Sequence, residues 1–144
     1  MKLLGWFALL LAGASVATAE VRTKVVEYKH GDAVLEGYLA WDDVIRGKRP
    51  GVLVVHEWTG LGSYARMRAE KLAGLGYVAF AIDMYGKGVR PKTPQEAGAQ
   101  AGIYKSDRQL MRARALAGLN VLIGNEMCDT KRGAALGACS GGTT

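Results

Sequence analysis

The chain has 144 residues, of which 49% are hydrophobic and 22% charged; this composition suits one packed domain and excludes a disordered chain. Its formal net charge is +6, but lysine and arginine are scattered among acidic residues. This pattern indicates a solvated surface of mixed charge and argues against a nucleic-acid-binding module.

The first 19 residues have the layout of a secretory signal peptide. Lys2 precedes the apolar run Leu3 to Leu11, and small residues lead to Ala17-Thr18-Ala19, an Ala-x-Ala cleavage site. We expect cleavage after Ala19 and an exported protein, periplasmic or secreted, with no membrane attachment. The alternative is an uncleaved anchor helix, which the shortness of the apolar run disfavours. Residues 20–144 are then one domain.

The next elements are a hairpin and a buried strand. Arg22–Tyr28 and Ala33–Trp41 are rich in Val, Leu and Tyr and flank the tight turn His30-Gly31-Asp32, which predicts a β-hairpin. Asp42–Pro50 is polar and should be a loop. Gly51–Val55 is a continuous apolar run, as expected of a strand covered on both faces.

Two helices and two further strands complete the pattern. A helix is predicted from Ser63, as its cap, to Leu75, with Gly76 ending it and a buried stripe made by Ala65, Ala69, Leu72, Ala73 and Leu75. There follow a buried strand over Tyr77–Ile82, a long excursion over Asp83–Gly102, a helix over Ser106–Ile123 and a narrow buried strand over Gly133–Leu136. The second helix should bury Leu110, Ala113, Ala117 and Val121 and direct Arg108, Arg112 and Arg114 largely to the other face.

This order of elements predicts an α/β fold: a mostly parallel sheet with flanking helices and an N-terminal β-hairpin. Ligands of such sheets bind at the carboxyl ends of the strands. Three strand ends are therefore the places to search for chemistry, namely His56-Glu57-Trp58, Asp83-Met84-Tyr85 and Ala138-Cys139-Ser140.

Both cysteines are predicted to be free thiols. A strand over Lys131–Ala138 would separate Cys128 from Cys139 by about 20 Å, whereas a disulfide needs Cα atoms within about 7 Å. Gly137 and Gly141 flank Cys139 at a spacing that suits a sharp strand-to-helix turn. Such a turn raises the thiol above the sheet at a helix N-terminus, which favours the thiolate.

Two alternatives to a Cys139 nucleophile stay open. In a second register, Ala138-Cys139-Ser140-Gly141-Gly142 places Ser140 as the nucleophile, but without a glycine two residues before it. Cys139 is otherwise a buried structural cysteine in a glycine-rich turn.

Glu57 directly follows a buried strand and is the candidate acceptor for the thiol proton. The backbone N–H groups of Trp58 and Ser140 fall where the two donors of an oxyanion hole are expected. The alternatives are an exposed loop acid for Glu57 and an apolar lid for Trp58. His30 is expected at the surface, and His56 is not assigned as general base, because the base of such folds comes later in the chain.

The second strand end offers turn and substrate contacts. Asp83 is best interpreted as a turn or capping residue. Tyr85, Lys87 and Arg90 are candidate substrate contacts, and the two basic residues would suit an anionic substrate. We expect no cofactor and no metal.

Together these residues resemble the dienelactone hydrolase family, a branch of the α/β-hydrolases. The resemblance covers essentially the whole mature chain and is carried by Val54-Val55-His56-Glu57-Trp58 with Gly60-Leu61, Leu75-Gly76-Tyr77-Val78-Ala79, Asp83-Met84-Tyr85-Gly86-Lys87-Gly88 and Gly137-Ala138-Cys139-Ser140-Gly141-Gly142.

The resemblance implies Cys139 as nucleophile, Glu57 as thiol activator and Trp58 and Ser140 as oxyanion donors. The implied reaction is hydrolysis of an enol lactone or related ester through an acyl thioester. Lys87 departs from the family, whose founding members have an arginine at this position that binds the substrate carboxylate. The lysine ammonium is a point charge and cannot form the two parallel hydrogen bonds of a guanidinium. Ser140 replaces the bulkier residue usual after the nucleophile.

The family's acid and histidine would lie beyond Thr144, so the resemblance implies an N-terminal part of the domain, with an open sheet edge and little activity alone. Two other functions compete with the hydrolase. One is a non-catalytic domain of the same fold that binds a small molecule or a partner. The other is a thiol redox protein, which the lack of a Cys-x-x-Cys pair disfavours.

Overall fold

The computed structural model describes residues 20–139, in which five strands and three helices form. The predicted signal peptide and Ser140 lie outside the described residues, so what concerns them stays a prediction. In chain order the elements are β1 (Val21–His30), β2 (Ala33–Asp42), β3 (Arg49–Val55), α1 (Ser63–Gly74), β4 (Val78–Ile82), α2 (Pro94–Ser106), α3 (Arg108–Ile123) and β5 (Cys128–Gly137).

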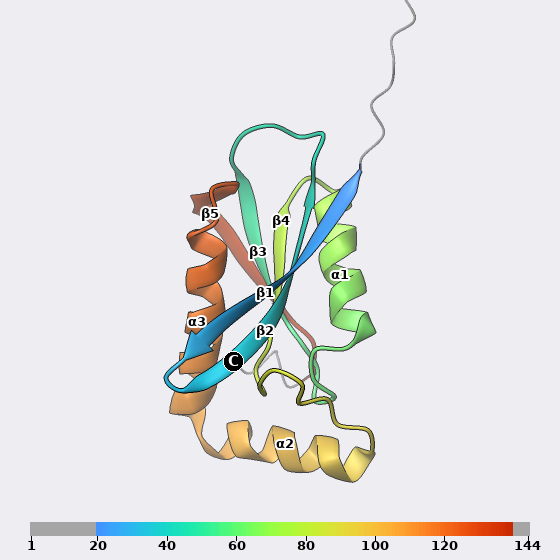
Figure 1. Ribbon diagram of the computed structural model, residues 1–144, viewed down its shortest axis with the longest axis vertical. Helices are drawn as coiled ribbons and strands as arrows, with labels where there is room; N and C mark the ends of the chain where they lie inside the picture. Colours follow the sequence, from blue (N-terminus) through green and yellow to red (C-terminus); the bar gives the residue numbers. More distant parts are fainter. Residues whose placement is uncertain (1–19, 140–144) are drawn as a thin grey trace, which may run out of the picture.

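All five strands belong to one sheet, in the order β1-β2-β4-β3-β5. β3, β4 and β5 run parallel to one another, and the β1-β2 hairpin joins β4 in antiparallel fashion. Figure 1 shows α1 on one side of the sheet, α3 on the other, and α2 across the end at which the parallel strands finish. The predicted α/β fold with an N-terminal hairpin is confirmed.

The sheet has a core on each face, and β4 contributes to both. Every residue of β4 is buried, as expected of a strand covered on both sides. Phe80 and Ile82 pack in the same cluster as Leu122 of α3, whereas Ala81 packs in the cluster of Ala69 of α1. Bulky residues on one face and alanines on the other let α1 approach the sheet closely.

The hairpin forms as predicted, with a slightly tighter turn. His30 pairs with Ala33, so Gly31 and Asp32 alone make the connection. Gly31 has φ +58, a left-handed conformation that glycine adopts without a steric penalty. His30 ends β1 and is half-buried rather than fully at the surface.

Among the described residues β5 is an edge strand, which confirms the predicted open sheet edge, but it is not the narrow buried strand that was predicted over Gly133–Leu136. Within the described residues it pairs with β3 alone, and residues 130–135 are exposed. The strand begins at Cys128, earlier than expected, and its register with β3 shifts between Pro50 and Gly51. An apolar run is buried only when a neighbour covers each of its sides, which its pattern does not reveal. Cys128 is buried and Cys139 exposed, and both are free thiols as predicted.

α2 is a helix that the sequence prediction missed, because Asp83–Gly102 was expected to be irregular. Thr93 caps it by accepting a hydrogen bond from the Glu96 N–H, and Pro94 occupies the first turn. The following helix begins at Arg108, with Asp107 as its cap. No helix within residues 20–139 combines the length and apolar character needed to cross a membrane.

Two details of α1 were predicted wrongly. The residue at the N-cap is Gly62, and no side chain caps this helix, so Ser63 does not have the expected role. Leu75 lies beyond the last turn and is 74% exposed rather than buried. Gly76 follows with φ +92 and ends the helix as predicted.

The buried face of α3 is rotated by about one residue from the predicted face. Met111, Arg114, Gly118 and Leu122 are buried, so the expectation that Arg114 faces solvent was wrong. A side chain at Gly118 would collide with Ile82 of β4, and this close approach sets which face of α3 meets the sheet. Arg114 is thereby turned inward, and its Nε and Nη1 have no hydrogen-bond partner among the described residues.

Candidate active site

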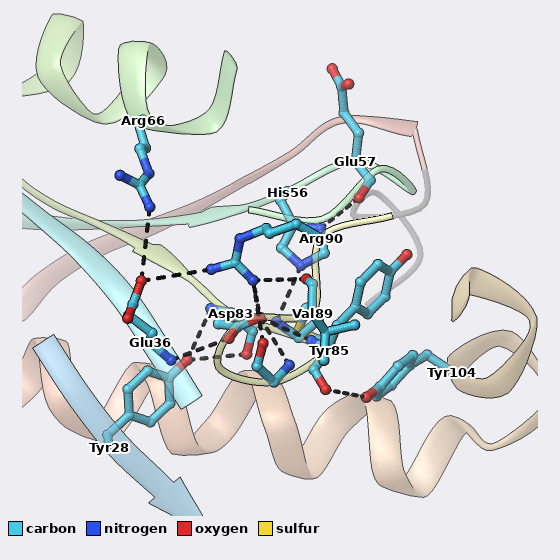
Figure 2. A network of polar contacts seen from close by, with 12 residues as sticks. Tyr28, Glu36, His56, Glu57, Arg66, Asp83, Tyr85, Val89, Arg90 and Tyr104 are labelled. Carbon is cyan, nitrogen blue, oxygen red and sulfur yellow. Dashed lines mark hydrogen bonds and ion pairs between the residues drawn. The ribbon is translucent and has the colours of Figure 1, made fainter. Parts of the chain in front are cut away.

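The three strand ends that carry the predicted site lie side by side. Val55 of β3 is in register with Ile82 of β4 and with Gly137 of β5. The residues that follow, His56, Asp83 and Ala138, therefore leave the sheet at the same level. The close-up in Figure 2 shows the first two of these ends with the polar residues around them.

Cys139 has the backbone conformation of a strained turn. Its φ is +55, and it is the one non-glycine residue with positive φ within residues 20–139. A side chain in this region costs about 1–2 kcal/mol, and such residues gather at active sites where the surrounding structure enforces them. The thiol is exposed, two residues after the end of β5. A positive φ two residues after a parallel strand is one feature expected of a nucleophile elbow.

Glu57 lies beside the elbow. Its half-buried side chain points away from the polar network of the β4 end, as Figure 2 shows. It lines a small hollow of about 50 Å³ together with Leu136 and Ala138 of the elbow segment. Tyr64 and Arg68 of α1 line the same hollow, although the sequence analysis singled out neither. Their spacing of four residues on a helix was the signal that could have found them.

Trp58 occupies an exposed tight turn. Gly60 N–H donates to the Glu57 carbonyl at 3.1 Å, so Trp58 and Thr59 are the central residues of the turn. Within residues 20–139 the Trp58 N–H has no hydrogen-bond acceptor. The Tyr85 hydroxyl donates to the Trp58 carbonyl at 2.7 Å. The turn thus presents a free backbone donor beside the β3 end.

Tyr85 is a structural donor more than a free substrate contact. Burial, and after it the charges of Tyr104 and Cys139, raises the pKa of Tyr85 to about 12. Its hydroxyl therefore keeps its proton at neutral pH and can donate to Trp58. The ring stacks on Tyr104, with centroids 5.2 Å apart.

His56 is buried, with 3% of its surface exposed, and both ring nitrogens are engaged. Nδ1 faces the Glu57 carbonyl and Nε2 accepts the Met84 N–H at 3.2 Å. Because a carbonyl only accepts and an amide N–H only donates, the ring is neutral with its proton on Nδ1. The lone pair on Nε2 is already occupied by the Met84 N–H, so it is not available to accept a proton as a general base.

The stability of the protein is expected to fall in mild acid because of His56. Burial lowers the pKa of His56 below its ordinary 6.5, even though the Glu57 carbonyl and the Asp83 charge raise it; the Arg90 charge lowers it further. Below pH 6.5 the unfolded chain binds a proton that the folded chain refuses, so stability is lost as the pH falls from 6.5 toward the folded pKa.

Urea unfolding of the wild type and of His56→Asn at pH 7.5 and pH 5 measures this loss. The variant cannot titrate and should show a flatter pH dependence. If both proteins lose the same unfolding free energy between pH 7.5 and pH 5, His56 is not the responsible group.

Asp83 is fully buried and organises the β4 end. Its carboxylate accepts the N–H groups of Tyr85 and Gly86 at 3.1 Å, and that of Glu36 at 3.2 Å. Arg90 adds an ion pair at 3.7 Å. Asp83 therefore has the turn role that the sequence favoured, and Figure 2 shows it at the centre of the network.

The two basic residues proposed for substrate binding have other partners. Lys87 forms an ion pair of 2.6 Å with Glu27 of β1. Arg90 donates to the carbonyls of Gly86 and Val89 and lies 3.9 Å from the Glu36 carboxylate. Of the basic residues, Arg68 is the one that lines the hollow beside Glu57. Within the described residues, no cluster of His, Cys, Asp and Glu could hold a metal ion.

The chain is similar to known proteins in sequence and in structure. Residues 35–144 match the model of the dienelactone hydrolase family. A protein of Aquifex aeolicus named "Putative carboxymethylenebutenolidase" is 38% identical over 78 residues, which are 52% of this chain and 32% of that protein.

Two solved structures are similar over 85% of this chain and 51% of their own chains. One, m3DLH, is 38% identical with a TM-score of 0.82. The other, a dienelactone hydrolase-like promiscuous phosphotriesterase from metagenomic libraries, is 35% identical with a TM-score of 0.80. The chain spans about half the length of these two relatives and about a third of the Aquifex protein. The match extends over most of the chain and includes every strand end of the site, so the chain belongs to the dienelactone hydrolase family.

Proposed function

We propose that the protein hydrolyses carboxylic esters or lactones, with Cys139 as its nucleophile. The observation that carries this proposal is the positive φ of Cys139 at a strand end level with Glu57. The name "Putative carboxymethylenebutenolidase" agrees with hydrolysis of a lactone. The dienelactone hydrolase-like promiscuous phosphotriesterase agrees more broadly with hydrolysis of ester bonds.

The reaction proceeds in two halves. Glu57 accepts the thiol proton, and the Cys139 sulfur attacks the carbonyl carbon, which forms a C–S bond and places the carbonyl electrons on oxygen. The backbone N–H groups of Trp58 and Ser140 stabilise this oxyanion. Collapse breaks the C–O bond, and the leaving alkoxide takes the proton held by Glu57 and departs as an alcohol. Water then attacks the acyl thioester, which breaks the C–S bond, releases the carboxylic acid and returns a proton to the Cys139 sulfur. In a lactone the leaving hydroxyl stays attached to the acyl group.

The hollow beside Glu57 supports a substrate class within this proposal. Its lining is largely apolar, with Arg68 as its cation and Glu57 as its acid. A small ester or lactone that carries an acidic group would place that group near Arg68, since Lys87 is paired with Glu27.

Acyl-enzyme trapping tests the proposal. The protein, expressed from its complete gene, is mixed with p-nitrophenyl acetate and quenched in acid. We expect an acetyl group on the peptide that contains Cys139, removable by neutral hydroxylamine as a thioester is, and none on buried Cys128. Acetylation of Ser140 would transfer the nucleophile to the second register. Saturable ester binding with neither turnover nor adduct would favour the non-catalytic domain.

A further inference from the structure

We propose that His56 is a positioning residue that fixes the direction of the Trp58 N–H and so assembles one donor of the oxyanion hole. This inference deepens the proposed function and rests on it. It assigns a task to a buried histidine that the reaction itself does not use.

The geometry of one peptide unit is the first step. The Glu57 carbonyl and the Trp58 N–H belong to the same trans peptide, in which they lie in one plane and point in opposite directions. Whatever holds the carbonyl therefore aims the N–H. Two donors hold it from outside the peptide: the His56 Nδ1–H and the N–H of Gly60. The Trp58 N–H is left pointing away from both.

The second step is that the His56 ring is itself immobile. Its Nε2 accepts the Met84 N–H from the neighbouring strand end at 3.2 Å. It also makes a T-shaped contact with the Tyr85 ring, at an interplanar angle of 73° and with centroids 4.8 Å apart. A ring rotation would break both hydrogen bonds inside a buried site, so the ring transmits the position of β4 to the turn after β3.

A third contact fixes the next peptide along. The Tyr85 hydroxyl holds the Trp58 carbonyl, so the peptide before Trp58 is held by His56, which follows β3, and the peptide after it by Tyr85, which lies close after β4. Gly60 belongs to the same turn as Trp58, whereas the His56 ring is bonded to Met84 outside the turn. His56 is therefore the group that relates the turn to the rest of the site.

The test compares two substitutions of nearly equal shape in the protein expressed from its complete gene. His56→Leu removes both ring hydrogen bonds. His56→Asn also loses the bond to Met84, but its amide N–H is placed near the Nδ1 position and can still donate to Glu57. The two variants therefore differ mainly in the bond that aims the Trp58 N–H. Tyr28→Phe, which removes a hydroxyl bonded to the backbone of Asp83, is the control for a lost polar contact at the same strand end.

We expect His56→Leu to lower kcat for p-nitrophenyl acetate by about 10²-fold with KM within a factor of three, since loss of an oxyanion donor acts on the transition state. His56→Asn should stay within about fivefold of the wild type, and Tyr28→Phe within twofold. A trifluoromethyl ketone forms an adduct with the thiol that carries an oxyanion. Its affinity for His56→Leu, relative to the wild type, should fall by the same factor as kcat/KM.

Three outcomes decide against the inference. Equal kcat losses in His56→Leu and His56→Asn would mean that the Glu57 bond is irrelevant. If His56→Leu does not fold, a 10²-fold loss of kcat in folded His56→Asn would likewise mean that the bond to Glu57 is irrelevant. Unchanged kcat in His56→Leu, with turnover still abolished by Cys139→Ala, would overturn the inference and leave the proposed function intact. Turnover that survives Cys139→Ala would instead overturn the proposed function.

Discussion

Replacement of Cys139 by alanine is expected to lower kcat/KM for ester hydrolysis by on the order of 10⁴-fold or more, because it removes the thiol proposed to form the acyl intermediate. The substitution leaves the fold nearly unchanged. The side chain is exposed, and alanine meets the same left-handed backbone at φ +55 that cysteine does. Stopped-flow release of p-nitrophenol measures the effect, with the melting temperature as a check of folding.

Ser140→Ala is the matched variant for this prediction. It keeps the backbone N–H of residue 140, which is the proposed oxyanion donor, and removes only the hydroxyl of the second register. Most of the turnover should therefore remain. Loss of turnover in Ser140→Ala together with its retention in Cys139→Ala would assign the nucleophile to serine.

Replacement of Asp83 by alanine should remove about 4 kcal/mol of unfolding free energy. Three backbone N–H groups, those of Glu36, Tyr85 and Gly86, lose their acceptor, and each buried donor left unsatisfied costs about 1–3 kcal/mol. Arg90 also loses the carboxylate 3.7 Å from its guanidinium. Because domains are stable by only about 5–15 kcal/mol, the variant should approach the unfolding threshold. Urea denaturation at pH 7.5 measures the change.

Asp83→Asn separates the turn contacts from the charge. Its amide oxygen can still accept from Tyr85 and Gly86, whereas its NH2 group would face the Glu36 N–H. We expect a loss of about 2 kcal/mol, half that of alanine, because one donor of three is left without an acceptor. Equal losses in both variants would indicate that the ion pair with Arg90 dominates. A loss below about 1 kcal/mol in the alanine variant would contradict the role given to Asp83.

The strands were predictable where a local pattern reports burial on both faces. The continuous apolar runs Gly51–Val55 and Tyr77–Ile82 correspond to β3 and β4, and Gly31 marked the hairpin. β5 shows the limit of that logic. Its small apolar residues resemble those of a central strand, but burial depends on neighbours that the pattern itself cannot report.

The helices were harder to predict for two different reasons. α2 begins with a clear signal, Thr93 capping Glu96, but Gly98 and Gly102 lower the helix propensity of its interior. In α3 Leu and Ala occur on nearly every side of the helix, so their periodicity could not indicate which side is buried against the sheet. The contact of Gly118 with Ile82 chose it, and a packing contact of this kind is invisible in one sequence.

The candidate site follows from the strand ends, which is why the sequence alone predicts Cys139, Glu57 and Trp58 as its members. The partners of Lys87 and Arg90 were not predictable, since Glu27 and Glu36 lie on the hairpin about 60 residues earlier in the chain. The task of His56 was equally hidden. Its hydrogen bonds go to backbone groups, and those groups carry no sequence signal.

The left-handed backbone at Cys139 also describes what kind of residue folding alone would select there. Glycine adopts φ +55 without the steric penalty that a Cβ brings. The backbone at this position therefore favours the Cys139→Gly variant over the cysteine. The thiol is thus present against the preference of the fold. Under the proposed function, the stability of the fold and the need for a nucleophile therefore favour different residues at position 139.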